Sequence, residues 1–218
     1  RGLGDVYKRQ DYKRAVNTAL KILLKCKQFT SPISLTQIIS NFDNIRLIKY
    51  SDAARSLGIS ISEYLHEFTN SNYAMSFFQK SAKKYIIIYN DSLDERVSRF
   101  TVAHELGHYF LKHKIDDEVS GKEANCFARN LLCPVPFIDA IECHGTLDYC
   151  QHFMVTPVMA EVSINYRNID FYCSEDYYYN NLYRLFQKYT YNYDPGEAYG
   201  TDYTLDQHEE QWLYGFVG

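Results

Sequence analysis

The chain has 218 residues, enough to bury a hydrophobic core as one domain or as one domain with a smaller appendage. Its formal net charge of -4 excludes the basic field that general nucleic-acid binding requires. No apolar run approaches the roughly 20 residues of a membrane-spanning helix, and the 21 Tyr and 13 Phe residues favour packed surfaces and a protein-binding face.

The first ten residues are set apart from the rest. Residues 1–10 resemble the translated remnant of a sequencing adapter, and the chain opens at Arg1 without a methionine. We therefore expect a non-native stretch at 1–10 and a missing native start. Nothing there resembles a signal peptide.

Two helices and a strand are expected next. Residues 11–29 carry apolar side chains at helical spacing, and Ser31-Pro32 ends that helix. A short helix is expected at 34–40, and apolar alternation in 44–50 predicts a strand.

Residues 51–68 have the outline of a helix-turn-helix. Gly58 is placed for the turn, and Ser60 or Ser62 can cap the second helix. A DNA-reading helix needs basic side chains, whereas this one offers acidic residues and a histidine. We predict two short helices packed on the domain and no direct nucleic-acid binding.

A β-hairpin is expected after them, with strands at 73–78 and 84–89. The uncharged, β-branched run in 85–89 is typical of a buried strand. Ser92-x-x-Glu95 is a capping box that predicts the start of the next helix.

That helix, expected at 95–113, carries a complete HExxH motif, His104-Glu105-Leu106-Gly107-His108. Residues four apart on a helix are separated by roughly 40° of rotation, so both imidazoles leave one face and can bind one zinc ion. Glu105 sits where it can polarise a water on that metal. The pairs His66-Glu67 and His208-Glu209 begin the same motif, but no second histidine completes either of them. Gly107 costs about 1 kcal/mol in a helix interior, which indicates a close approach by another segment.

A catalytic zinc usually takes three protein ligands and one water, so a third ligand is needed. The next predicted helix, 121–133, carries Glu123 near its start. Ser120-x-x-Glu123 is itself a capping box, so Glu123 can also be only a helix cap. Other acidic residues compete as the ligand: first Glu118, then Asp116 and Asp117.

The six cysteines form no C-x-x-C pair. A chain of this length and apolar content does not need disulfides, so we expect reduced thiols in a cytoplasmic protein. Cys143-His144 and Cys150-Gln151-His152 match no standard metal-binding spacing, and we assign them no metal.

Residues 99–108 read RFTVAHELGH, and residues 123–134 read EANCFARNLLCP. These blocks resemble the ImmA/IrrE family of metallopeptidases, whose members show R-F-T-x-A-H-E-L-G-H followed by E-A-N-x-F-A-x-x-L-L-x-P. The resemblance extends over residues 45–136, and Cys133 stands where many members have Met. It implies a gluzincin-like zinc site in which the E-A-N glutamate, Glu123 here, is the third ligand beside His104 and His108.

The fold predicted is α+β: a mostly helical, zincin-like metallopeptidase domain with a small β-sheet, a hairpin, beside the HExxH helix. We place this domain at residues 11–173, closed by a helical segment at 147–167. A Tyr-rich helical extension is expected at 174–218. It would comprise an amphipathic helix at 175–189, a loop at 190–203 and a last helix at 205–216.

The predicted function is that of a zinc-dependent endopeptidase in the cytoplasm. Glu105 would take the proton of the attacking water and pass it to the leaving amine. Zinc would share the charge of the oxyanion with a Tyr or His donor that the sequence does not identify. His113 is a poor choice for that donor, because on an ideal helix it points roughly 140° away from His108. The resemblance implies a protein substrate, a helix-turn-helix repressor of a prophage or mobile element. The alternatives are a catalytically inactive, zinc-containing regulatory or DNA-binding module, and an interaction subunit that uses the Tyr-rich end.

Overall fold

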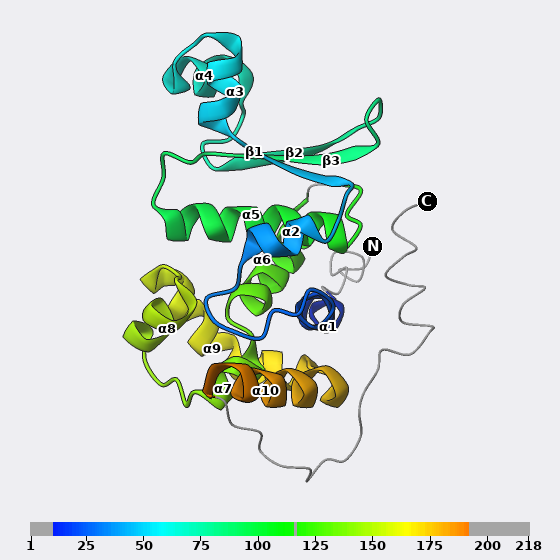
Figure 1. Ribbon diagram of the computed structural model, residues 1–218, viewed down its shortest axis with the longest axis vertical. Helices are drawn as coiled ribbons and strands as arrows, with labels where there is room; N and C mark the ends of the chain where they lie inside the picture. The colour runs from blue at the N-terminus through cyan, green and yellow to red at the C-terminus, as the bar shows by residue number, and fades with distance from the viewer. Residues whose placement is uncertain (1–10, 116, 192–218) are drawn as a thin grey trace, which may run out of the picture.

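The computed structural model describes residues 11–115 and 117–191 and has the predicted α+β fold, mostly helical with one small sheet (Figure 1). None of the helices in these ranges is long and apolar enough to cross a membrane. The elements follow in this order: α1 (Tyr12–Lys25), α2 (Leu35–Ser40), β1 (Ile45–Lys49), α3 (Tyr50–Leu57), α4 (Ile61–Phe68), β2 (Ala74–Gln79), β3 (Lys84–Tyr89), α5 (Glu95–Phe110), α6 (Glu118–Leu132), α7 (Val135–Ala140), α8 (Thr146–Phe153), α9 (Pro157–Cys173) and α10 (Asp176–Tyr191).

The sheet has three strands in the order β1-β3-β2. The predicted hairpin is confirmed as the antiparallel pair β2 and β3, and β1 adds a parallel strand on the other side of β3. The central strand β3 is buried on both faces. Ile86 and Ile88 pack against the α3–α4 pair, and Ile87 joins the main core. This explains the uncharged run in that strand.

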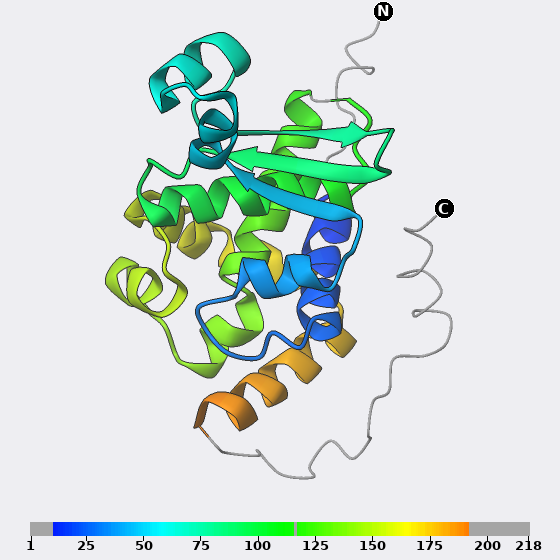
Figure 2. The same ribbon diagram turned by 45° about the horizontal axis from the view of Figure 1, so that its top comes forward.

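The sheet lies between two helical layers, with α3 and α4 on one face and α5 on the other (Figures 1 and 2). The helix pair predicted at 51–68 is confirmed. Gly58 ends α3 with φ 72°, and Ser60 caps α4 in a capping box with Glu63. The Tyr50 and Tyr64 rings lie 5.4 Å apart between the two helices.

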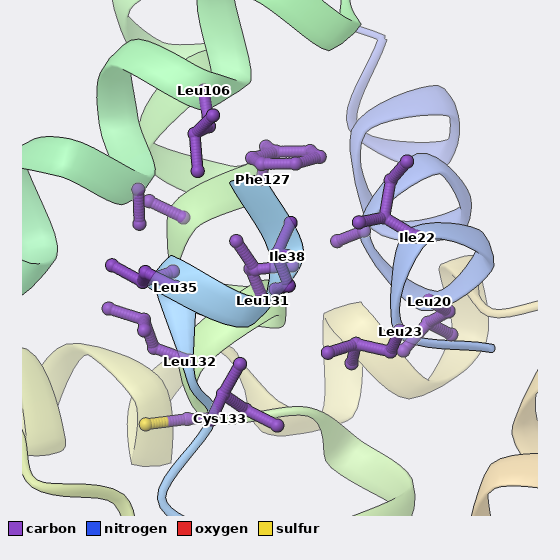
Figure 3. Packing of buried hydrophobic residues seen from close by; sticks show 14 of the residues in the cluster. Leu20, Ile22, Leu23, Leu35, Ile38, Leu106, Phe127, Leu131, Leu132 and Cys133 are labelled. Atoms are coloured by element: carbon purple, nitrogen blue, oxygen red, sulfur yellow. The ribbon is translucent and has the colours of Figure 1, made fainter. Parts of the chain in front are cut away.

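The main core lies on the far side of α5, around α6 (Figure 3). Phe127 and Leu131 of α6 are fully buried, between Leu106 of α5 and the leucines of α1 (Figure 3). The amphipathic helix predicted at 175–189 is α10, and Phe186 packs its ring 4.2 Å from that of Phe137 in α7. The boundary after residue 173 stays a prediction. The loop predicted at 190–203 begins too early, because residues 190 and 191 still belong to α10. The rest of that loop and the helix predicted at 205–216 lie outside the described residues.

Both capping boxes predicted for the two central helices are wrong. Helix α5 is capped by Asp94, because the amide and hydroxyl of Ser92 donate to the side chain of Asn90 instead. Helix α6 begins at Glu118 with Asp117 as its cap, so the Ser120-x-x-Glu123 box does not form and Glu123 lies inside the helix.

The segment predicted at 147–167 forms two helices, α8 and α9, because Met154 adopts a left-handed conformation and Pro157 starts a new helix. The cysteines are free, as predicted. Burial raises the pKa of the Cys26 and Cys126 thiols to about 12, which keeps them protonated.

Helices α5 and α6 cross in close contact at Gly107. This confirms the close approach by another segment that a glycine inside a helix predicted. A Cβ atom at Gly107 would lie 3.0 Å from the Cα and 3.1 Å from the carbonyl oxygen of Ala124. Both atoms belong to the α6 backbone, so no side-chain rotation can make room.

Gly107→Ala should therefore destabilise the protein by up to about 2 kcal/mol. The helix-propensity gain of about 1 kcal/mol is outweighed by the overpacking cost of about 1–3 kcal/mol. Gly121→Ala in α6 is the matched control, because a Cβ there meets nothing within 4 Å, and it should stabilise. Urea unfolding of both variants measures the difference; equal effects would show that the crossing does not depend on Gly107.

Candidate metal centre

His104 and His108 lie one turn apart on α5 and face each other. Their Nε2 atoms are 3.0 Å apart, and the ring centroids are 4.8 Å apart. Both side chains are partly buried. The helical spacing thus brings the two imidazoles of the HExxH motif together, as predicted.

The orientation of His104 is fixed by α6. Its Nδ1 lies 2.8 Å from the Oδ1 atom of Asn125, which is the asparagine of the E-A-N block. A carbonyl oxygen only accepts, so Nδ1 carries the proton and Nε2 presents its lone pair toward His108. A second partner on the far ring nitrogen is the usual arrangement of a metal-binding histidine.

The Glu105 carboxylate is held by the sheet. Ser76 of β2 donates its hydroxyl to Glu105 Oε2, and the same Oγ lies 2.6 Å from the hydroxyl of Tyr85 in β3. The Tyr85 ring packs 5.0 Å from that of Tyr109. The sequence carried no signal for Ser76, because its position over α5 depends on how the sheet packs.

An open cleft of about 650 Å³ runs between β2 and the C-terminal end of α5. Among the residues that the structure describes, β2 pairs with β3 alone, so its other edge is available along this cleft. The cleft is lined by side chains of β2 and the two histidines and by the residues just after α5: Ala74, Met75, Ser76, Phe77, Phe78, His104, Glu105, His108, His113, Lys114 and Ile115.

Glu123 lies close to the histidines but makes other contacts. Its Oε1 accepts from the Asp11 amide at 2.8 Å, and its Oε2 lies 3.1 Å from both Arg14 Nη2 and His113 Nε2. Burial alone would raise the pKa of this carboxyl, but the Asp11 amide, His113 and Arg14 outweigh burial and lower it. The ionised carboxylate therefore acts only as an acceptor.

His113 is a member of the site that the sequence prediction missed. Helix α5 ends at Phe110, and Lys112 takes φ 54°, which turns the chain back. The His113 amide then donates to the His108 carbonyl at 3.0 Å, and the Nδ1 atoms of the two rings lie 3.1 Å apart. The expectation that His113 points away is wrong, because it assumed a helix continuing through residue 113.

The other candidate ligands lie apart from the pair. Glu118 is exposed and paired with Lys122, Asp117 caps α6, and Asp116 falls outside the described residues. Within residues 11–115 and 117–191, no group of three or more His, Cys, Asp or Glu side chains is arranged to hold a metal ion. Glu123 as the third ligand stays a prediction.

The histidine pair itself fits zinc. At 3.0 Å the two Nε2 atoms are joined either by one N–H that donates to the other nitrogen or, when both present lone pairs, by a cation between them. Zinc binds imidazole nitrogen at about 2.0–2.1 Å with tetrahedral geometry, which places two nitrogens about 3.3 Å apart. An increase of a few tenths of an ångström in the distance between the two Nε2 atoms would let both bind one zinc ion.

A sequence model of the family Peptidase_M78, described as the IrrE N-terminal-like domain, matches residues 54–163. The match covers half of the chain and contains His104, Glu105, His108, Glu123 and the strands β2 and β3. Among curated proteins, none matches the chain.

Asn125→Leu should weaken zinc binding about 10-fold or more, because His104 loses the acceptor that fixes its tautomer. Asn125→Asp keeps an acceptor at the same place and should retain the affinity. Competition with a chromophoric chelator measures both. Equal affinities for wild type and Asn125→Leu would show that this contact does not support the metal.

Proposed function

The chain belongs to the peptidase family of the IrrE N-terminal-like domain, and from this membership we propose that it is a zinc-dependent endopeptidase. The family supports a metallopeptidase-type function with a protein substrate, and its peptidases are generally zinc-dependent. The observation that carries the proposal is the facing Nε2 atoms of His104 and His108, with Glu105 beside them at the cleft.

His104 and His108 would hold the zinc, with Glu123 as the third ligand that the sequence predicts. When bound, zinc would supply a Lewis acid that polarises the scissile carbonyl and lowers the pKa of water. Glu105 would remove the proton of the attacking water and deliver it to the leaving amine. Ser76 fixes one oxygen of the Glu105 carboxylate, so this base would be oriented before the substrate arrives.

The substrate would bind in extended form along β2. An extended peptide can add to a sheet edge through main-chain hydrogen bonds, while side-chain pockets give specificity. The available edge of β2 lies along the cleft, where Phe77 and Phe78 are about half exposed. Apolar residues of the substrate would pack on these rings.

A helix-turn-helix repressor of a prophage or mobile element is the substrate that the family resemblance suggests. The cytoplasm is the location we propose. The six free cysteines support it, because cysteines of secreted proteins usually form disulfides. Direct DNA binding by the helix pair α3–α4 is not part of the proposal, because α4 carries no lysine or arginine.

Metal analysis and a cleavage assay with a purified helix-turn-helix repressor test the function. Wild type should carry about one zinc per chain and cleave the repressor. Glu105→Gln should keep the zinc and lose cleavage by about 10²–10⁴-fold, the usual contribution of a general base. His104→Ala should lose both.

Glu118→Gln is the control, because Glu118 is an exposed acid at the start of α6, paired with Lys122, and its loss should change neither zinc content nor cleavage. If Glu105→Gln cleaves as well as wild type, the endopeptidase proposal is wrong. Bound zinc with no cleavage by wild type would favour the inactive regulatory module instead.

A further inference from the structure

A second hollow lies beside the histidine pair, on the side of α5 that faces away from the sheet (Figure 1). It has a volume of about 260 Å³ and lies between the N-terminal half of α5, helix α6 and the first turns of α9. We call it the α5–α9 pocket. Its apolar walls come from two helices: Val97, Phe100, Val158, Met159 and Val162. The residues that line this pocket and those that line the cleft along β2 do not overlap.

The pocket continues the row of side chains that carries the histidine pair. Val97, Phe100, His104 and His108 follow one another three or four residues apart, so they share one face of α5. The ring of Phe100 lies 6.5 Å from that of His104. Asn125, which lines the pocket, holds His104 Nδ1 at 2.8 Å, and this contact is exposed. A peptide that lies over His104 can therefore reach both the cleft and the pocket.

The charge inside the pocket is compensated. Arg129 is the charged residue among the described side chains that line it. Its Nε and Nη2 atoms each donate to the Asp170 carboxylate at 2.7 Å, and the Tyr166 ring lies 4.6 Å from the guanidinium carbon. The side chains of this ion pair are only 9% and 3% exposed. A charged group that entered the pocket would lose water without gaining a free counter-charge, whereas an apolar group would lose nothing.

The rim of the pocket is apolar and open to the surface. Val158 and Val162 lie four residues apart on α9 and are 71% and 40% exposed. Deeper in the pocket, Met159 is buried. Contiguous exposed apolar surface of this kind marks a ligand-binding groove when it surrounds a hollow. The shape and chemistry thus fit an apolar group that enters from outside.

We propose that the α5–α9 pocket binds a large apolar side chain of the peptide substrate, such as Leu, Met or Phe. This inference rests on the proposed function and names the substrate class of the same site. The pocket begins 6.5 Å from His104, a distance that about two residues of an extended chain span. The bound side chain therefore belongs to a residue within two positions of the scissile bond. The peptide lies between the β2 edge and α9, and Val162 limits the size of the side chain accepted.

The three methionines allow a binding test that needs no activity. Met159 lines the pocket, Met75 lines the cleft along β2, and Met154 lines neither hollow. The probe is N-acetylphenylalanine amide, added to the purified full-length protein with labelled methionine methyl groups. It should shift the Met159 signal in a saturable way and leave Met154 unchanged, and N-acetylaspartate amide should shift neither. A shift of Met75 without Met159 would overturn the inference.

Two substitutions at the rim link this binding to the pocket. Val162→Phe fills the space from a partly exposed position and should abolish the saturable shift of Met159. Val158→Glu should weaken it, and an acid in the first turn of α9 does not endanger the fold. Ile169→Phe is the matched control, because Ile169 is exposed two turns after Val162 and lies outside the pocket. Binding by Val162→Phe that equals wild type contradicts the proposal, and thermal unfolding checks the fold of each variant.

Cleavage of a purified helix-turn-helix repressor separates this inference from the proposed function. Replacing the large apolar residue within two positions of the cleaved bond by Ala should lower kcat/KM about 10–200-fold, the range for an apolar pocket. Val162→Phe should reduce that preference, and Ile169→Phe should keep it. If the repressor is cleaved equally well with Leu and Asp at these positions, the pocket assignment is wrong and the endopeptidase stands. A saturable Met159 shift in a protein that cleaves no repressor contradicts only the proposed function.

Discussion

The close crossing of α5 and α6 at Gly107 determines the geometry of the whole site. The backbone of Ala124 lies against α5 at Gly107, and the two neighbours of Ala124 on α6 are rotated about 100° to either side of it. Asn125 reaches His104 on one flank, and Glu123 reaches His113 on the other. A single interhelical contact thus positions both outer partners of the histidine pair.

The sheet positions the Glu105 side of the site, and its strand order follows from which side chains are buried. Strand β3 has apolar side chains on both faces, so it must be covered by helices on both sides and must be the central strand. In the described part of the chain, β2 is consequently left with one unpaired edge, and its alternation turns Ser76 toward α5. The base Glu105 is oriented by a strand whose position depends on hydrophobic packing.

The local parts of this architecture could be predicted from the sequence, and the long-range parts could not. The HExxH spacing, the helix pair around Gly58 and the hairpin depend on neighbouring residues, and all three are present. The pairing of β1 with β3 joins segments about 40 residues apart, and the Arg14–Glu123 contact joins residues 109 apart. The capping predictions failed for a similar reason: Ser92 is drawn to Asn90, which is itself held by the Asn72 carbonyl.

His113 shows most clearly how a tertiary contact can decide where a helix ends. Helices commonly stop at a glycine in the left-handed region, whereas here the residue is Lys112, for which that conformation costs about 1–2 kcal/mol. The cost is offset by the hydrogen bond of the His113 amide and by the partners that its imidazole gains on both nitrogens. The end of α5 and the orientation of His108 are therefore coupled through one imidazole. The helical periodicity of the sequence continues to residue 113 and cannot show that α5 ends at Phe110. The position of His113 after that end depends on the Glu123 carboxylate, which α6 provides.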